Sequence, residues 1–178
     1  RGEQHIISDE GKPIYFNLLN QIEWCKNEFQ VVNQITQTGE HHNRYDVTIL
    51  INGLPLVHIE LKKKGVEMGQ AFISNGVNTQ YYANNREINS EQTFYWADEE
   101  NNKISNLSEF SDIFLEPCHL SKMISKYIVL ASTTKQLMVL RPYQYYAAEK
   151  IYKQVKNTNK NGYIWHTTGS GKTLSSFK

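Results

Sequence analysis

The feature that most constrains the fold of this 178-residue chain is a glycine-rich loop near its end, WHTTGSGKT, from Trp165 to Thr173. The apolar run YIWH, Tyr163–His166, predicts a short buried strand before the loop, and a helix is predicted to begin after it. A strand, a glycine-rich loop and a helix in this order form a phosphate-binding unit. Glycines let backbone N–H groups turn onto phosphate oxygens, and the helix N-terminus adds partial positive charge. An α/β fold is therefore expected around the loop.

The loop has the residue types that hold a nucleotide. The residues predicted to bind it are Gly169, Ser170, Gly171, Lys172 and Thr173. Lys172 is expected to reach the β and γ phosphates and Thr173 to hold Mg²⁺. His166 replaces the usual first glycine, which disfavours a small kinase or a GTPase and is tolerated in helicase-like motors. The alternative is a glycine-rich turn that only leads into a helix.

The tetrapeptide RPYQ, Arg141–Gln144, lies upstream of the loop. Taken alone, it is explained by a proline that begins a helix and by a solvated glutamine. Together with the loop it resembles the adenine-reading element of superfamily 2 helicases, in which the glutamine amide offers a donor and an acceptor to the base. Gln144 therefore predicts a preference for ATP over GTP. The helix that begins at Pro142 is predicted to have one apolar face, formed by Ala147, Ile151 and Val155.

The first third of the chain has the pattern of an α/β domain. Pro13–Trp24 predicts an amphipathic helix and Phe29–Gln37 predicts a strand. Two apolar runs, Tyr45–Ile51 and Leu54–Lys62, flank Asn52-Gly53, which is a turn signal typical of a β-hairpin.

Two carboxylates and a lysine are predicted to meet on this hairpin. Side chains alternate along a strand, so Glu60 and Lys62 project to the same side, with Asp46 across the hairpin. Carboxylates can hold Mg²⁺ for phosphodiester hydrolysis, and a lysine can position or deprotonate the nucleophile. We therefore predict that Asp46, Glu60 and Lys62 are catalytic and that Asp46 and Glu60 bind the metal. The alternative is a chance match with a solvated strand end. His58 alternates with Glu60 and is expected to line the same face.

A break in the pattern follows the hairpin. Val66–Phe72 looks like the start of a helix, whereas ISNGVNT from Ile73 is typical of the polar end of a buried strand. A helical crossover to a parallel strand needs about a dozen residues or more, which the interval between Lys62 and Ile73 hardly provides. We therefore predict that a segment is absent between Phe72 and Ile73.

The remaining elements are a strand at Thr93–Asp98 and helices at Leu107–Leu115 and Pro117–Val129, the second with Pro117 in its first turn. The polar segment ASTTKQ, residues 131–136, lacks periodicity and is predicted to be a linker.

Composition adds little about partners. The formal net charge is +1, and nucleic-acid binding depends on where basic residues cluster. No apolar run is long enough for a membrane helix, so a cytoplasmic protein is expected. The two cysteines, Cys25 and Cys118, lack metal-type spacing and are expected to be buried thiols rather than a disulfide.

Five stretches together resemble the restriction (R) subunit family of type I restriction enzymes: RGEQ, NRYDVTILINGLPLVHIELKKKG, FLEPCHLSKMISKY, LRPYQ and WHTTGSGKT. The resemblance implies a PD-(D/E)xK restriction-endonuclease-like domain over residues 1–130. A linker at 131–136 and the start of a RecA-like superfamily 2 helicase domain at 137–178 would follow. It also implies the catalytic and nucleotide-binding positions predicted above. The family's Gln-x-x-x-Tyr motif is not matched, because Ser74 follows Gln70 at that spacing.

The same resemblance implies Mg²⁺ and ATP as cofactors and double-stranded DNA as substrate. The implied partners are specificity and methyltransferase subunits in a bacterial or archaeal cytoplasm, without a membrane. Two alternatives stay open. One is a superfamily 2 translocase whose N-terminal domain binds DNA without cutting it, and the other is an assembly module without enzymatic activity.

Overall fold

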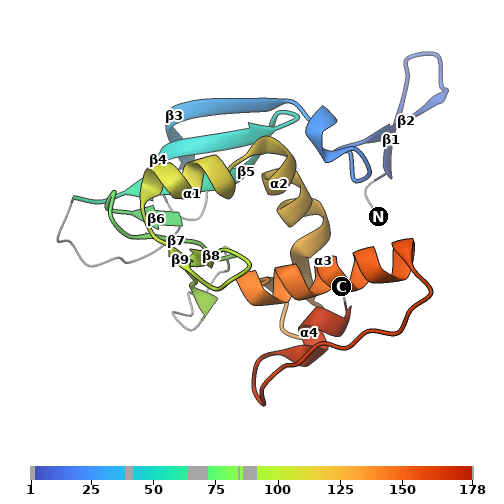
Figure 1. Ribbon diagram of the computed structural model, residues 1–178. Coiled ribbons are helices and arrows are strands. Elements are labelled where there is room, and N and C mark those ends of the chain that lie inside the picture. Colours follow the sequence, from blue (N-terminus) through green and yellow to red (C-terminus); the bar gives the residue numbers. More distant parts are fainter. Residues whose placement is uncertain (1–2, 39–41, 64–71, 84, 86–91, 178) are drawn as a thin grey trace.

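The computed structural model describes residues 3–38, 42–63, 72–83, 85 and 92–177. Figure 1 shows a strand-rich part at the top of the view, with helices α1 and α2 beside it and α3 and α4 at the bottom. Strands and helices are mixed along the chain, so the predicted α/β class is confirmed.

A five-stranded mixed sheet, in the order β3-β4-β5-β6-β7, carries the predicted hairpin. Its strands are β3 (Phe29–Thr38), β4 (His42–Ile51), β5 (Leu54–Leu61), β6 (Phe72–Ser74) and β7 (Thr79–Gln80). All neighbours are antiparallel except β5 and β6, which pair in parallel. Asn52 and Gly53 both have positive φ angles, 51° and 79°, as a tight two-residue hairpin turn requires. The strands and the turn predicted here are confirmed.

Two short helices follow in sequence, α1 (Leu107–Ile113) and α2 (Pro117–Lys122), and α2 continues as a π-helical turn, η3 (Met123–Tyr127). Asn106 caps α1 and Glu116 caps α2, each by accepting hydrogen bonds from backbone N–H groups of the first turn. Pro117 begins α2 as predicted. The helix expected to reach Val129 ends at Tyr127, and a strand begins at the next residue, Ile128.

One apolar cluster joins the sheet, these helices and α3 (Pro142–Asn157). At its centre is Trp96, which lies on β8 (Trp96–Ala97), a short strand paired with β9 (Lys103–Ile104). The Trp96 indole is fully buried, and ring centroids lie 4.9 to 5.8 Å from it. These rings belong to Tyr81, Phe114, His119, Tyr145 and Tyr146. Since α3 supplies the last two, the cluster includes residues from both sides of the predicted linker.

The predicted linker, residues 131–136, contains the turn of a β-hairpin formed by β10 (Ile128–Ala131) and β11 (Gln136–Val139). The hydroxyl of Tyr81 donates a 2.9 Å hydrogen bond to the carbonyl of Leu140, just after this hairpin. The position of a domain boundary at these residues stays a prediction.

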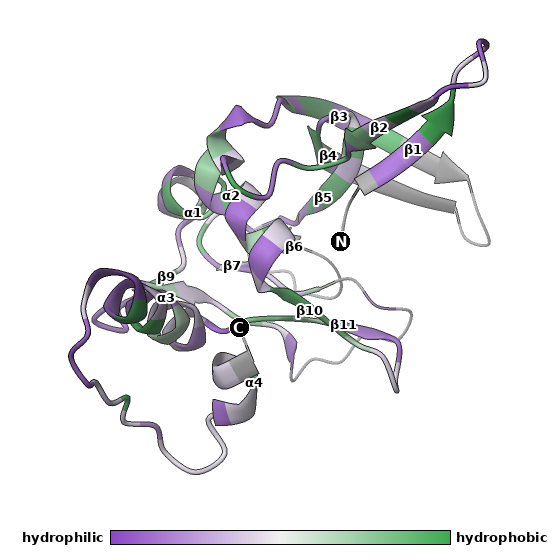
Figure 2. Ribbon diagram, turned by 90° about the vertical axis from the view of Figure 1, so that its right-hand side faces the viewer, coloured by the Kyte–Doolittle hydropathy of each residue, from purple (hydrophilic) through white to green (hydrophobic). Residues whose placement is uncertain are grey.

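The helix predicted over Pro13–Trp24 is wrong. The elements found in this region are β1 (Glu3–Ile7), the antiparallel β2 (Pro13–Asn17) and a 3₁₀ turn, η1 (Trp24–Lys26). Three consecutive apolar residues from Ile14 include β-branched and aromatic side chains, which favour a strand once a partner strand is present. Asn20 then accepts hydrogen bonds from the N–H groups of Ile22 and Glu23, which turns the chain where the helix would continue. Figure 2 shows apolar residues on this projecting hairpin.

The buried strand predicted at Tyr163–His166 is also wrong. The chain between α3 and α4 (Lys172–Phe177) is irregular, and Tyr163 and Trp165 are each 89% exposed. A strand needs a neighbour for its backbone N–H and C=O groups, and none of the described strands pairs with this segment.

The predicted apolar face of α3 is only partly buried. Ala147 lies in the core, whereas Ile151 and Val155 are 40% and 76% exposed. The core therefore covers only the first half of this face.

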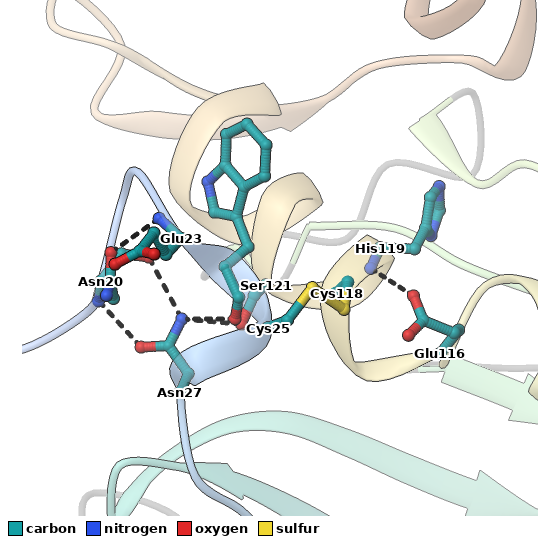
Figure 3. Close-up of a disulfide and its surroundings, with 9 residues drawn as sticks. Asn20, Glu23, Cys25, Asn27, Glu116, Cys118, His119 and Ser121 are labelled. Carbon is teal, nitrogen blue, oxygen red and sulfur yellow. Dashed lines mark hydrogen bonds between the residues drawn. A yellow bond between two sulfur atoms is a disulfide. The ribbon is translucent and has the colours of Figure 1, made fainter.

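The two cysteines were expected to be thiols, but the structure joins them in a disulfide. The Cα atoms of Cys25 in η1 and Cys118 in α2 are 4.4 Å apart, although 93 residues separate them in sequence. Figure 3 shows that Asn27, directly after η1, also contacts α2, since its side chain donates a 3.1 Å hydrogen bond to the hydroxyl of Ser121. Packing of η1 against α2 brings the two sulfur atoms together, which sequence spacing does not reveal.

None of the helices in the described ranges has the length and apolar content that crossing a bilayer requires. The expected segment break between Phe72 and Ile73 stays a prediction; in the structure both residues belong to β6. The helix start predicted at Val66 lies outside the described residues.

We expect Trp96→Ala to lower the free energy of unfolding by about 3–5 kcal/mol, because it removes a fully buried ring from the core. Trp165→Ala makes the same change at an exposed position and should alter it by less than about 0.5 kcal/mol. Denaturant unfolding followed by circular dichroism measures both values. Equal losses in the two variants would contradict the central position of Trp96.

Under non-reducing conditions, mass spectrometry of peptides should find Cys25 joined to Cys118. Cys118→Ser is expected to lower the free energy of unfolding by about 2–4 kcal/mol, because the crosslink restricts the unfolded chain. A reducing agent should destabilise the original protein by a similar amount and leave the variant unchanged. The disulfide is refuted if the reducing agent has no effect on the original protein.

Candidate functional site

The structure brings Asp46, Glu60 and Lys62 together at one end of the β4–β5 hairpin. The Oδ2 atom of Asp46 accepts a 2.8 Å hydrogen bond from the backbone N–H of Leu61, which ties the aspartate to the opposite strand. Glu60 and Lys62 form an ion pair through Oε1 and Nζ, and their side chains are 27% and 33% exposed. Alternation places Glu60 and Lys62 on one face of β5, and a register shift between Ile49 and Leu50 sets the position of Asp46 on the neighbouring strand.

The electrostatics of this group centre on Lys62. The hydrogen bond and the negative charge of Glu60 raise the pKa of Lys62, and Asp46 contributes in the same direction. Lys62 is therefore a cation throughout the neutral pH range. It suits stabilisation of negative charge better than removal of a proton.

A more buried group lies beside these charges. The ring of His58 stacks on Tyr45 with centroids 4.0 Å apart, and its Nδ1 lies 3.1 Å from the hydroxyl oxygen of Thr48, which is fully buried. Burial lowers the pKa of His58, so the ring is neutral at pH 7. His58 is thus on the same strand as Glu60, and its ring is packed against Tyr45 and Thr48.

Tyr82 is a neighbour that the sequence did not indicate. It is 9% exposed, and its pKa is raised to about 12 chiefly by burial and by the negative charge of Glu60. Its hydroxyl therefore keeps its proton near Glu60 at neutral pH. Nothing in the local sequence signals this placement, because Tyr82 follows β7 and reaches Glu60 only through folding of the sheet.

The residues present fit a magnesium ion held partly by water. Among the described residues, no group of three or more His, Cys, Asp or Glu side chains could enclose a metal. Mg²⁺ typically binds one or two carboxylates, retains several waters and takes further oxygens from substrate phosphates. Because Oδ2 of Asp46 and Oε1 of Glu60 are engaged in hydrogen bonds, Oδ1 and Oε2 are the oxygens that such an ion would bind.

The glycine-rich loop connects to α4 with the backbone geometry expected of it. Gly169 and Gly171 have φ angles of +79° and +74°, a region that glycine adopts without steric cost. The ammonium of Lys172 donates a 3.3 Å hydrogen bond to the carbonyl of Thr167, across the loop. Lys172 and Thr173 are both exposed and therefore accessible to a ligand.

Gln144 lies against this loop. Its Nε2 donates hydrogen bonds to the carbonyls of Ser170 at 3.0 Å and Gly171 at 3.4 Å, and its Oε1 accepts one from the backbone N–H of Arg141 at 2.9 Å. A Cβ atom on Gly171 would lie 2.4 Å from Gln144 Nε2, so the contact requires glycine at this position. The structure thus brings Gln144 to the loop, where its amide binds protein backbone. Its role in reading adenine stays a prediction.

A cavity of about 180 Å³ opens beside Gln144 and the loop. Residues of the loop, Phe94 and Met138 are among those that line it. The guanidinium of Arg141 lies 4.8 Å from the ring centroid of Phe94 and forms part of the wall. An apolar wall with a few converging polar groups is typical of a small-molecule site.

Comparison with known proteins places these features in a family. Residues 3–97 match the family described as type I restriction enzyme R protein N terminus. The whole chain is 46% identical to the endonuclease subunit of a type I restriction enzyme from Staphylococcus saprophyticus. The chain belongs to the type I restriction enzyme R protein family. A Staphylococcus aureus relative shows the same identity, and one from Escherichia coli is 37% identical over 86% of this chain and 58% of that protein.

The R protein relatives are longer than this chain. It spans 22% of the length of the two staphylococcal subunits. Their alignments extend over 201 positions, more than the 178 residues present here, so these relatives carry positions without a counterpart in this chain. Residues 143–178, which include Gln144 and the glycine-rich loop, match the SWI2/SNF2 ATPase family.

Glu60→Gln is expected to lower the pKa of Lys62 in this R protein family member, because Glu60 supplies the largest contributions that raise it. The raised pKa means that the folded state holds this proton more tightly. The ion pair between Lys62 and Glu60 is thus fully formed at neutral pH, and its contribution to stability is lost only as the pH rises through the pKa of Lys62. NMR titration of the lysine side-chain signals measures the change. Asp46→Asn should lower the pKa less, and the larger shift in this second variant would contradict the geometry.

Proposed function

We propose that this chain carries the DNA-cleaving site of a type I restriction enzyme R protein together with the beginning of its ATP-driven motor. The observation that carries the proposal is the convergence of Asp46, Glu60 and Lys62 on one hairpin. The names of the relatives as endonuclease subunits support it. The D…ExK pattern on a hairpin fits a PD-(D/E)xK restriction-endonuclease-like domain.

The proposed chemistry is hydrolysis of a phosphodiester bond. Asp46 and Glu60 present carboxylate oxygens to Mg²⁺, which when bound supplies Lewis-acid stabilisation and lowers the pKa of a water. Glu60 also holds the ammonium of Lys62 beside the site. Since the pKa of Lys62 is raised, we assign this residue to stabilising charge on the scissile phosphate and to positioning the nucleophile.

The second part of the proposal is an ATP site. Lys172 and Thr173 would contact the phosphates and Mg²⁺, and the backbone of Gly169, Ser170 and Gly171 would surround the phosphates. We keep Gln144 as the adenine-reading residue. Because its amide is bonded to Ser170 and Gly171, reading a base requires it to exchange one of these bonds. The match to the SWI2/SNF2 ATPase family supports a RecA-like motor here.

For the whole protein we propose an ATP-dependent translocase that moves and cuts double-stranded DNA in the cytoplasm. Specificity and methyltransferase subunits would supply sequence recognition. The second candidate is a translocase whose N-terminal part binds DNA without cutting it. The ATPase match to residues 143–178 supports a motor in both candidates.

Cutting of plasmid DNA with Mg²⁺ and ATP tests the proposal, with the intact R protein assembled with its two partner subunits. Glu60→Ala should reduce cutting on the order of 100-fold or more, because it removes a carboxylate that stabilises the reacting centre, and ATP hydrolysis should persist. Lys172→Ala should abolish ATP hydrolysis and the cutting that depends on it.

The chain contains a matched control for Glu60. Glu10 and Lys12 form an ion pair at the same sequence spacing, with a separation of 3.2 Å, but both side chains are more than three-quarters exposed, at 77% and 78%. Glu10→Ala should leave cutting and ATP hydrolysis unchanged. If Glu60→Ala cuts as well as Glu10→Ala, the hairpin is structural and the non-cleaving alternative is favoured. Loss of subunit association with intact cutting chemistry would instead favour an assembly role.

A further inference from the structure

A cluster of charges and aromatic rings lies away from both sites, between α3 and the helices that precede it. Glu149, in the middle of α3, forms ion pairs with Lys122 of α2 and with Lys126 of η3, the second at 3.3 Å. It also accepts a hydrogen bond from the hydroxyl of Tyr127. The side chains of Glu149 and Lys122 are only 13% and 17% exposed. The carboxylate is therefore held by three donors in a largely dry environment.

Aromatic rings surround the two lysines of this cluster. The ammonium of Lys122 lies 5.1 Å from the ring centroid of Trp24 in η1, and the ammonium of Lys126 lies 4.3 Å from that of Tyr152 in α3. A cation over an aromatic face is attracted by the ring, more strongly where water is excluded. The cluster consequently joins η1, α2 with η3, and α3.

The protonation states fit this assembly. Burial by itself would raise the pKa of Glu149, but hydrogen bonds from Lys122 and Tyr127 and the charges of both lysines outweigh burial and lower it. Burial and the hydrogen bond to Glu149 raise the pKa of Tyr127. Glu149 is thus ionised and Tyr127 protonated at neutral pH. Removal of one partner would leave a poorly compensated charge in a largely buried place.

The two ends of this connection are fixed to different parts of the molecule. On one side, α2 is held to η1 by the Cys25–Cys118 disulfide and by the hydrogen bond between Asn27 and Ser121. On the other side, α3 begins with the residues that touch the glycine-rich loop, because Gln144 is 4% exposed and donates to Ser170 and Gly171. Glu149 lies between these attachments, on the same rigid helix as Gln144.

We infer that Glu149 is a positioning residue for the nucleotide site. It anchors α3 to α2 and η3, and so sets where Gln144 holds the glycine-rich loop. This inference rests on the proposed ATP site and adds a physical link to the part of the chain that carries Asp46, Glu60 and Lys62. Coupling between two sites is reciprocal, so ATP binding would in turn favour this arrangement of α2 and α3.

Direct binding of a fluorescent ATP analogue with Mg²⁺ to the intact R protein tests the inference. Glu149→Gln keeps the size of the side chain but removes its charge and replaces one acceptor oxygen with an amide donor. We expect it to weaken binding at least about fivefold, which is the lower end of typical coupling between sites. Lys153→Gln is the matched control, because Lys153 lies one turn further along α3 and is exposed. Its affinity should stay within about twofold.

Thermal unfolding separates positioning from simple stability. A merely structural role predicts a lower melting temperature for Glu149→Gln with unchanged affinity of the folded protein, and that result would overturn the inference. Should Glu149→Gln fail to fold, Tyr127→Phe removes only one hydroxyl from the cluster and should weaken binding in the same direction. The double variant Lys122→Gln with Glu149→Gln should lose less binding free energy than the sum of the losses in the two single variants, because the two residues act through one ion pair.

Lys172→Ala separates failure of this inference from failure of the proposed function. If Lys172→Ala loses the analogue while Glu149→Gln and Tyr127→Phe bind it normally, the ATP site stands and the positioning role of Glu149 is wrong. Normal binding by Lys172→Ala would overturn the proposed ATP site and, with it, the inference.

Discussion

The packing of aromatic rings around the buried indole of Trp96 is the interaction on which the rest of the structure depends. Its indole is fully buried among rings from the region after β7, from α1 and α2, and from α3. The helices α1 and α2, with seven and six residues, are too short to be stable by themselves, so they depend on packing around this ring. As a result, the helix that leads to the glycine-rich loop shares a core with the sheet that carries the candidate nuclease site.

The candidate nuclease site follows from simpler rules. A tight turn at Asn52-Gly53 starts the pairing of β4 and β5, and a register shift between Ile49 and Leu50 then moves the pairing by one residue. Beyond this bulge Val47 pairs with Ile59, and alternation along the strands determines which side chains share a face. The carboxylates of Asp46 and Glu60 and the ammonium of Lys62 meet for this reason. The shared face of Glu60 and Lys62 could therefore be predicted from residue order, whereas the bulge that sets the register of Asp46 could not. Tyr82 could not be predicted either, because it follows β7 and reaches Glu60 only through folding of the sheet.

The predictions that failed share a physical cause. Local spacing favoured a helix at Pro13–Trp24, but a neighbouring strand competed successfully for the same backbone groups. At Tyr163–His166 the opposite holds, because the run has the composition of a strand and no strand in the described part of the chain pairs with it. The thiols of Cys25 and Cys118 became a disulfide through the packing of two helical turns. In each case the missing information was the identity of a distant partner.

The sequence by itself determined the hairpin with its turn, the start of α2 at Pro117, the glycine conformations of the loop and the shared face of Glu60 and Lys62. These features depend on neighbours within a few residues or on strand alternation, both of which are written in residue order. Only the tertiary structure decided that Glu149 lies between Lys122 and Tyr127 and that Gln144 binds the loop carbonyls. It also decided that one core joins the two regions. Such contacts arise when apolar surfaces from distant segments are buried together, and polar groups trapped at these surfaces must find whatever partners the packing provides.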